Sequence, residues 1–560
     1  MNLFNRQFWY VFWHLTIPYW FSEEKWGARA LLMVLLLLVL SVNGVDVYWS
    51  FINRDFMTAL ANKNTSKFFY LALIYIGSFV IMIPLVVFYT YFQQKLRIYW
   101  RRWLTCYFLD KYFSNRNFYT INYNSEIDNP DERISQDIEA FTIATLEYFL
   151  KIIESIITLI SFLGILYSIS FSLVIIVIVY VFLGSFITIL LGKKLIKLNF
   201  KQLQKEANFR YQLIYVRNHS EMIAFFMGEK PELKQIKKTF NAVFKNLMEL
   251  IGWQRNLRFF TVGYNYFHLI IPSLVIAPLY FNGKVEFGVI TQANLAFAQI
   301  LSAFSLIVRQ FDSLSAFIAQ INRLGSFLTV MNLSTQKQQQ EFNCIHTQID
   351  NRIAIKEMTL LTPDYKRTLI KHLSFTLEPA SDLLIWGPSG CGKSSLLRAI
   401  AGLDNAGTGL IIRPDIEQML FLPQRPYMIL GTLRDQLLYP YRRSQVKDEE
   451  LQQVLQQVNL QGLEERFGGF DVQYDWRSVL SVGEQQRVNF ARILLNQPDY
   501  VILDEATSAL DLKNEKDLYK YLKDIGITFI STGHRPSLLD YHDYILELQV
   551  DSSWRWKKMN

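Results

Sequence analysis

Six apolar stretches, each close to the length of a membrane-crossing helix, place the strongest constraint on how this chain can fold. They lie at about 28–48, 69–92, 149–169, 172–191, 261–281 and 289–308. The hydrocarbon core of a bilayer is ~30 Å thick, and a helix needs roughly 20 apolar residues to cross it. The fifth stretch holds Pro272 and Pro278, which membrane helices tolerate because neighbouring groups satisfy the freed carbonyls. The sequence therefore predicts an α-helical membrane domain at 28–333 with six transmembrane helices.

Basic residues set the expected orientation of these helices. The net charge is +8, and charged residues make up only 19% of the chain. Lys and Arg are concentrated in two connections, 93–147 and 193–260, which flank apolar helices and form no separate basic domain. By the positive-inside rule, both connections and both termini lie in the cytoplasm. This distribution favours the lipid bilayer over nucleic acid as the partner of the basic residues.

The segments around the spans have their own patterns. The two basic connections have a helical pattern, so we expect the membrane helices to continue as long cytoplasmic extensions. Segment 1–27 is rich in aromatic residues but too interrupted to span a bilayer, and we expect it to lie in the interface. A polar stretch at 334–350 is the expected linker to a domain at 351–560, where alternating strand and helix patterns predict an α/β fold.

A glycine-rich motif lies near the start of this second domain. Segment 387–394 satisfies G-x-x-x-x-G-K-[ST], between an apolar strand pattern at 383–386 and a helical pattern from Ser395. Its residues are Gly387, Pro388, Ser389, Gly390, Cys391, Gly392, Lys393 and Ser394. Glycines let backbone N–H groups surround phosphate oxygens, Lys393 reaches the β- and γ-phosphates, and the Ser394 hydroxyl can ligate Mg²⁺. The motif therefore predicts a P-loop nucleotide site that extends to Ser395.

The apolar strand pattern at 499–505 ends in two carboxylates. In a P-loop enzyme the first, Asp504, belongs near Mg²⁺, and Glu505 is placed to orient or deprotonate the attacking water. The segment 480–487, Leu-Ser-Val-Gly-Glu-Gln-Gln-Arg, precedes them by about twenty residues. With the P-loop, a glutamine in Phe-Leu-Pro-Gln, Ser-Ala-Leu-Asp and a histidine, this ordered set resembles the ATP-binding cassette of ABC transporters.

The resemblance implies ATP as the nucleotide and a role for each matching residue. Gln424 would touch Mg²⁺ and the coupling surface, and His534 would be the switch histidine. Asp511 would lie in the D-loop. The signature segment, with Ser481, Gly483 and Glu484, would contact nucleotide held by a partner cassette.

One cassette and six spans imply a half-transporter that works as a homodimer. Each ATP site would then combine Lys393 and Glu505 of one copy with Ser481 of the other.

The sequence departs from the general cassette pattern in two places. Val482 and Glu484 stand where Gly and Gln are usual, which implies one weaker nucleotide contact. Thr362-Pro363 stands where Tyr-Pro is expected, and Tyr365 is the candidate residue for stacking on adenine.

Further motifs narrow the resemblance to one branch of the family. They are the segments 129–138 and 209–229, the Leu-Ser-x-Gly-Glu-Gln-Gln-Arg signature, and Gly533-His534-Arg535. Together they resemble the bacterial SbmA/BacA-related ABC transporters and the peroxisomal subfamily D. The resemblance implies an exporter-type fold and, for the bacterial members, uptake of hydrophilic compounds such as cobalamin, bleomycin or antimicrobial peptides. Short loops and the absence of a targeting segment favour the bacterial inner membrane as the expected location.

The substrate and its direction stay open at this point. Export, or transport of a lipid or fatty acyl-CoA, uses the same cassette. A membrane-tethered ATPase sensor or an ATP-gated channel is the alternative from another class. Asn43 and Asp46 lie in or near the first span, where an ionisable residue is a functional candidate. The competing interpretation puts Asp46 at the outer interface, solvated or paired with Arg54.

Overall fold

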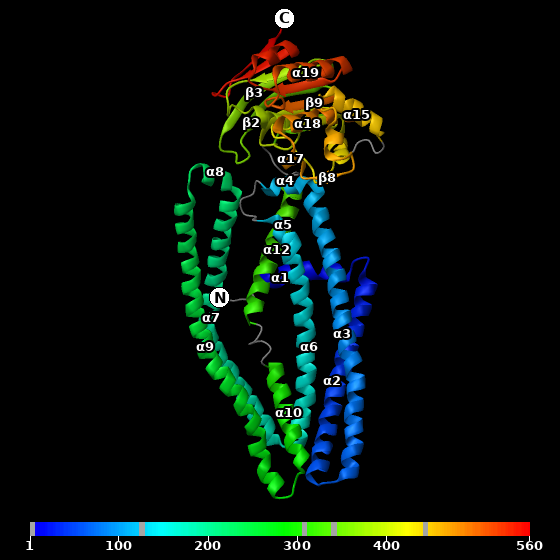
Figure 1. The fold of residues 1–560 in the computed structure, drawn as a ribbon, viewed down its shortest axis with the longest axis vertical. Coiled ribbons are helices and arrows are strands. Elements are labelled where there is room, and N and C mark those ends of the chain that lie inside the picture. The colour runs from blue at the N-terminus through cyan, green and yellow to red at the C-terminus, as the bar shows by residue number, and fades with distance from the viewer. Residues whose placement is uncertain (1–5, 123–128, 305–310, 338–343, 441–445, 560) are drawn as a thin grey trace. The chain divides into compact units, whose positions relative to one another are not determined.

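The computed structural model describes residues 6–122, 129–304, 311–337, 344–440 and 446–559. The chain divides into two compact units, Met1–Gln338 and Gln339–Asn560. The first unit is helical and the second contains strands and helices (Figure 1).

The first unit is a set of long helices with short ones between them. In chain order they are α1 (Arg6–Trp20), α2 (Lys25–Ala61), α3 (Thr65–Phe113), η1 (Ser114–Arg116), α4 (Asn117–Asn122), α5 (Pro130–Glu132), the π-helix η2 (Arg133–Asp137), α6 (Ile138–Ile169), α7 (Phe171–Asn218), α8 (Ser220–Phe225), α9 (Glu229–Phe281), α10 (Phe287–Phe304) and α12 (Phe311–Lys337).

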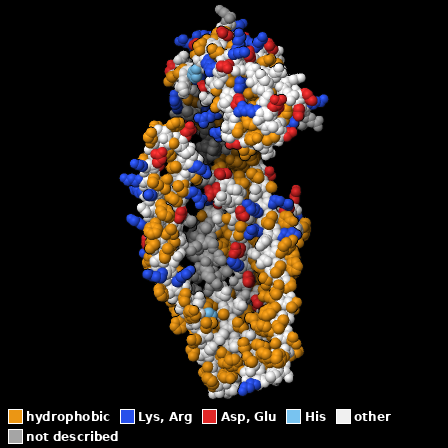
Figure 2. All heavy atoms as spheres, in the orientation of Figure 1, with side chains coloured by type: hydrophobic (Ala, Val, Ile, Leu, Met, Phe, Trp, Pro, Cys, Tyr) orange, Lys and Arg blue, Asp and Glu red, His pale blue; other side chains and the backbone are white. Residues whose placement is uncertain are grey.

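Among the described residues, six helices are long and apolar enough to cross a membrane. These six apolar segments correspond to α2, α3, α6, α7, α9 and α10, which confirms the six predicted spans. Residues 305–308 of the sixth predicted span lie outside the described residues. Large apolar side chains point outward from them, such as Leu73 and Val80 on α3, which are 71% and 70% exposed. In Figure 2 hydrophobic side chains cover the lower part of this unit. Such a surface is suited to lipid, where the helix backbone satisfies its own polar groups.

Three of these helices are much longer than a bilayer is thick. α3, α7 and α9 contain 49, 48 and 53 residues. At ~1.5 Å per residue each is more than twice as long as the ~30 Å hydrocarbon core, so each continues well outside it. α7 and α9 run side by side (Figure 1). The Asn246 side chain of α9 donates to the Leu198 carbonyl (3.1 Å) and to the Gln202 side chain (2.9 Å) of α7, which ties the pair together outside the apolar spans.

The first basic connection is less continuous than the sequence predicts. α3 ends at Phe113, and Asn115 and Arg116 take left-handed backbone conformations with φ of 49° and 56°. A right-handed helix does not continue through such residues. Asn129 is also left-handed, with φ 39°, and Pro130 follows at the first helical position of α5.

α1 has one face on the helical bundle and one face exposed. Phe8, Leu15 and Tyr19 are buried, and the Tyr19 ring stacks on Trp100 of α3 with ring centroids 5.6 Å apart. The opposite face exposes aromatic and apolar side chains, namely Trp9, Tyr10, Trp13 and Ile17. An amphipathic aromatic helix of this kind is typical of a membrane interface.

Within its described residues, the second unit holds three sheets and a group of helices. Its elements are β1 (His346–Ile349), β2 (Ile353–Leu361), β3 (Thr368–Leu377), β4 (Leu383–Trp386), α13 (Lys393–Ile400), β5 (Gly407–Arg413), η3 (Ile416–Gln418), β6 (Met419–Leu422), β7 (Gly431–Thr432), α14 (Leu433–Leu438), α15 (Asp448–Gln457), α16 (Leu463–Phe467), β8 (Gln473–Tyr474), α17 (Trp476–Val479), α18 (Val482–Asn496), β9 (Tyr500–Asp504), α19 (Leu512–Ile525), β10 (Thr528–Thr532), η4 (Pro536–Tyr541), β11 (Tyr544–Leu548) and β12 (Trp554–Lys558).

The largest sheet positions the candidate site. Its strand order is β12-β11-β4-β10-β9-β6, and every pairing except that of β12 is parallel. The carboxyl ends of β4, β9, β10 and β6 therefore meet at one edge, where ligands bind in open α/β sheets. A smaller sheet, β1-β5-β2-β3, packs its apolar residues with β4 and α13 in a shared core.

The segment predicted as a linker is shorter in the structure. α12 continues to Lys337, because Gln and Lys are good helix formers even in a polar stretch. At the other end, His346–Ile349 forms β1 and pairs with β5. Residues 338–343 lie outside the described residues.

Candidate functional site

The predicted phosphate loop joins β4 to α13. Gly387, Gly390 and Gly392 have φ of 155°, 79° and 104°, conformations that L-residues rarely adopt. A Cβ on Gly387 would lie 2.4 Å from the Leu548 carbonyl oxygen, so only glycine fits there. Pro388, Ser389 and Gly390 are exposed at the rim, and Cys391 is buried beneath them. The loop thus has the open backbone that phosphate recognition requires.

Lys393 is buried at the base of this loop. Only 7% of it is exposed. Its ammonium group donates to the carbonyls of Gly387 (2.7 Å) and Pro388 (3.1 Å) and lies 3.1 Å from His534 Nε2. The fold therefore holds a positive charge directly below the exposed loop and close to the predicted switch histidine.

Oxygen ligands gather beside the loop at the ends of β9 and β10. The Ser394 hydroxyl donates to Asp504 Oδ1 (3.1 Å), and the Thr532 hydroxyl donates to the same oxygen (2.7 Å). Thr532 is 2% exposed, and its hydroxyl also accepts the Glu505 N–H (3.0 Å). The sequence motifs do not single out Thr532, although a threonine two residues before His534, at the end of a strand pattern, is an available signal.

Glu505 lies where three predicted residues converge. Its backbone is left-handed, with φ 47°, which turns the chain out of β9. Gln424 donates to Glu505 Oε2 (2.7 Å), and His534 Nε2 lies 3.3 Å from Glu505 Oε1. The structure thus brings together Lys393, Gln424, Glu505 and His534, although 141 residues separate the first from the last.

These groups fit a nucleotide with a divalent cation. Mg²⁺ prefers hard oxygen ligands, and the Ser394 hydroxyl, the Asp504 carboxylate and the Gln424 amide supply three at one edge of the sheet. The adjacent loop and Lys393 supply donors and positive charge for phosphates. The Glu505 carboxylate, held by Gln424 and His534, lies beside the same ligands, as a group that accepts a proton from water must do.

The signature segment lies apart from this cluster. Ser481 caps the N-terminus of α18, where its hydroxyl accepts the Glu484 N–H (3.3 Å) and the Glu484 carboxylate accepts the Ser481 N–H (2.7 Å). A Cβ on Gly483 would lie 3.3 Å from the Ala509 carbonyl oxygen. Across the described residues, no hydrogen bond or ion pair joins Ser481, Gly483 or Glu484 to Lys393 or Glu505.

The predicted D-loop lies between β9 and α19 in the chain and contacts the signature helix α18. The Ala509 N–H donates to the Gln486 side chain of α18 (3.0 Å), and Asp511 caps α19 by accepting the Asn514 N–H (2.7 Å). That hydrogen bond lowers the pKa of Asp511. Arg535, next to the switch histidine, donates to the carbonyls of Leu510 and Ser508 (2.8 Å each).

Tyr365, the candidate residue for stacking on adenine, lies on the connection that leads to β3. Tyr365 lies in the turn between β2 and β3, with φ 60°, and is 43% exposed. β3 then passes the phosphate loop, where a Cβ on Gly392 would lie 3.3 Å from the Leu369 Cβ. Stacking of Tyr365 on adenine stays a prediction.

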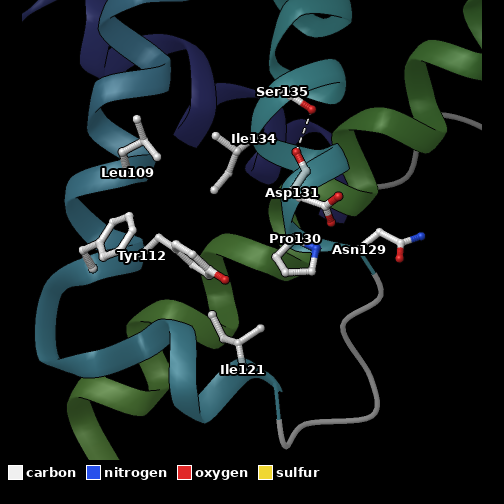
Figure 3. Close-up of a pocket in the computed structure, with 9 residues that line it drawn as sticks. Leu109, Tyr112, Ile121, Asn129, Pro130, Asp131, Ile134 and Ser135 are labelled. Atoms are coloured by element: carbon white, nitrogen blue, oxygen red, sulfur yellow. Dashed lines mark hydrogen bonds between the residues drawn. The ribbon is translucent and has the colours of Figure 1, made fainter. Parts of the chain in front are cut away.

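The segment 129–138 forms a different feature, in the first unit. It lines a cavity of about 640 Å³ with the end of α3, and Figure 3 shows Tyr112, Ile121, Pro130 and Ile134 around it. Next to this cavity, Arg133 donates to the Arg323 carbonyl of α12 (2.6 Å). The Arg323 guanidinium in turn pairs with the carboxylates of Glu132 (3.3 Å) and Asp137 (3.1 Å). This network fixes the segment to α12.

Polar residues of the first span are partly satisfied within the bundle. Asn43 is 4% exposed and accepts a hydrogen bond from Thr158 of α6 (2.7 Å). Arg54 pairs with the adjacent Asp55 (2.9 Å), so the structure does not support the predicted pairing of Arg54 with Asp46.

Comparisons with known proteins agree with this geometry. A family model of the ABC transporter transmembrane region 2 matches residues 14–281, and one of the ABC transporter matches residues 370–508. An uncharacterized ABC transporter ATP-binding protein of Synechocystis sp. is 48% identical over 96% of this chain and 83% of its own length. The chloroplastic ABC transporter D family member 2 of Arabidopsis thaliana is 40% identical over 98% of this chain and 88% of its own. The lysosomal cobalamin transporter ABCD4 of Mus musculus is 31% identical, over 96% and 93%.

A P-loop cassette with its signature segment, carried on a multi-pass membrane unit, defines an ATP-hydrolysing membrane transporter. The chain belongs to the ABC transporter family, among the half-transporters similar to subfamily D, as its motifs predicted.

Proposed function

We propose that two copies of this chain form a homodimer in which each ATP site is shared between the copies. Lys393, Ser394 and Glu505 of one copy would face Ser481 and Gly483 of the other. The observation that most directly supports this proposal is that, among the described residues, no hydrogen bond or ion pair joins the signature segment to the phosphate-loop cluster, since a second cassette would bring the two parts to one nucleotide. Hydrolysis then separates the two cassettes again.

Within each site, the residues divide the work by chemistry. Ser394, Asp504 and Gln424 would hold Mg²⁺, which would supply charge neutralisation at the phosphates. Lys393 binds the same phosphates. The Glu505 carboxylate takes a proton from the attacking water, and His534 stabilises the charge that develops on the γ-phosphate.

We propose uptake of hydrophilic compounds, such as cobalamin, bleomycin or antimicrobial peptides, as the transport activity. One relative is named as a cobalamin transporter, which supports this substrate class. Export, or transport of a lipid or fatty acyl-CoA, would use the same ATP site, so the transport assay must distinguish them.

We place the protein in the bacterial inner membrane with the cassette and both termini in the cytoplasm. The basic extensions of α7 and α9 support this orientation. In a variant whose native cysteines are replaced, a cysteine in place of Lys63 or Lys284, in the turns after α2 and α9, should react with an impermeant maleimide in intact cells. A cysteine kept only at position 106 should react only after the cells are opened. The reverse pattern would contradict the orientation.

The experiment that tests the function measures ATP-dependent uptake by right-side-out and inside-out vesicles, with cobalamin, bleomycin, a cationic peptide and an acyl-CoA as probes. Glu505→Gln should abolish both hydrolysis and uptake, while Glu449→Gln on the exposed start of α15 is the matched control. Flux that persists in Glu505→Gln would refute the mechanism. ATP turnover without flux of any probe would favour the sensor, and flux down a gradient without turnover would favour the channel.

A further inference from the structure

The signature segment carries a negative charge where most cassettes carry a neutral glutamine. Glu484 occupies the third helical position of α18, with 16% of its side chain exposed. One carboxylate oxygen accepts the Ser481 N–H. Partial burial alone would raise the pKa of Glu484, but its hydrogen bonds with Ser481 and Arg466 outweigh burial and lower that pKa. The side chain is therefore ionised at neutral pH.

That charge sits at a place suited to an anion. The N-terminus of a helix carries positive partial charge because its first N–H groups have no partner within the helix. Ser481 and Val482 are exposed there. In the part of the chain that the structure describes, the N–H groups of Val482 and Gly483 have no hydrogen-bond acceptor. An uncompensated carboxylate on Glu484 would cancel part of this positive potential and repel a phosphate.

Arg466 supplies the missing compensation. Its guanidinium donates to the second Glu484 carboxylate oxygen at 2.7 Å. Arg466 belongs to α16, eighteen residues earlier in the chain, and lies over the ring of Phe467 at 4.8 Å. Phe467 in turn meets the edge of Trp476, which is 1% exposed, with ring centroids 5.1 Å apart. A buried aromatic contact thus holds the arginine in place while 52% of its side chain stays exposed.

We propose that Arg466 is a positioning residue for ATP: by neutralising Glu484, it lets a signature segment with a carboxylate bind the γ-phosphate held by a second copy. This inference rests on the proposed function, in which the signature faces nucleotide in the homodimer. The Arg466–Glu484 pair has no net charge, and in this respect it replaces the neutral glutamine of other cassettes. The charge of Glu484 in the signature segment is then balanced by Arg466, so the contact of this segment with phosphate is not weakened.

The test is the ATPase activity of the purified full-length dimer, with kcat and KM for ATP measured separately. Arg466→Ala should raise KM about three- to tenfold with a smaller change in kcat, since a charge near phosphate is unmasked. Glu484→Gln should change KM in the opposite direction, because it leaves Arg466 unpaired and attractive to phosphate. The double variant should have a lower KM than Arg466→Ala. Because the pair is partly exposed, the defect of Arg466→Ala should shrink as salt rises to about 0.5 M.

A purely structural role predicts a different pattern. If the pair only fastened α16 to α18, both single variants would weaken activity in the same direction and the double variant would not recover. That result, or an unchanged KM in Arg466→Ala, would overturn the inference. Ser481→Ala separates this inference from the proposed function: if Ser481→Ala lowers kcat/KM for ATP while Arg466→Ala leaves KM unchanged, only the inference fails. If neither variant changes kcat or KM, the shared site of the homodimer fails as well.

Discussion

Replacing Thr532 with valine tests the geometry of the ATP site with a change of almost no volume. The Thr532 hydroxyl donates to Asp504 at 2.7 Å and accepts the Glu505 N–H at 3.0 Å, and the side chain is 2% exposed. Valine removes both hydrogen bonds at once. The first involves a carboxylate, and such bonds contribute about 1.5–3 kcal/mol. The second leaves a partly buried N–H without its acceptor, which costs about 1–3 kcal/mol.

These losses add up to about 2.5–6 kcal/mol, shared between stability and catalysis. For a unit of this size we expect the apparent melting temperature of the cassette to fall by about 5–10 °C. The turnover number should fall about 10- to 100-fold, because Asp504 and Glu505 lose the group that fixes them both. ATPase activity should also need more Mg²⁺, since Asp504 is then less well oriented.

The assay compares the ATPase rate across a Mg²⁺ titration, together with thermal unfolding in detergent, for the native protein, Thr532→Val and Thr532→Ser. Serine keeps the hydroxyl, so its rate should stay within about threefold of the native rate. A valine variant with native turnover and native Mg²⁺ dependence would refute the reasoning. Equal losses in both variants would mean that any change in the packing of this side chain disturbs the site, and that the hydroxyl has no special role.

Three further predictions follow from other parts of the structure. Gly387→Ala should weaken ATP-analogue binding about tenfold or more, because its Cβ would meet a carbonyl oxygen at 2.4 Å, and Gly390→Ala should weaken it less because its Cβ meets open space; equal effects would contradict this. Burial raises the pKa of Asp382 to about 7, so its contribution to stability is present at low pH and is lost as pH rises from about 4 to about 7. In Asp382→Asn the melting temperature should no longer fall for this reason as pH rises across this range. If the slope of melting temperature against pH were the same as in the native protein, the assignment to Asp382 would be wrong. Arg323→Ala removes ion pairs at 3.3 Å and 3.1 Å and should lower the melting temperature of the first unit by an amount worth about 1–2 kcal/mol, whereas an unshifted transition would mean that the network contributes nothing.

The parts of the fold that local physics determines were predictable from the sequence. The six spans follow from apolar length alone, and the phosphate loop follows from glycines between a strand and a helix pattern. The break after Phe113 was not predictable, because Asn115 and Arg116 adopt left-handed conformations that neither residue type requires. The helix past residue 333 was not predicted, because polar composition is typical of a linker while the Gln and Lys residues within it also favour helix.

The parts of the site that depend on distant pairing were harder to predict. Thr532 reaches Asp504 because β10 and β9 are paired in parallel with these two residues in register. The sequence predicts both strands but not their register. Arg466 reaches Glu484 only through the packing of Phe467 on Trp476. The roles taken from motif order, such as those of Gln424 and His534, needed no such knowledge, and the structure brings these two residues to Glu505.

The length of α7 and α9 has a mechanical consequence. α7 has 48 residues, and after ~30 Å of bilayer roughly 40 Å of helix remains beyond the hydrocarbon core. Since the two helices are hydrogen-bonded along this part, they move as one stiff arm. A tilt of the arm displaces its far end, near Ser220, by roughly 0.7 Å per degree. A rotation of about 5° within the membrane thus shifts the tip by more than 3 Å, the size of one side-chain contact. Deleting two helical turns from both α7 and α9 within this arm would cut that displacement by about a quarter, and it would leave the spans and the ATP site unchanged.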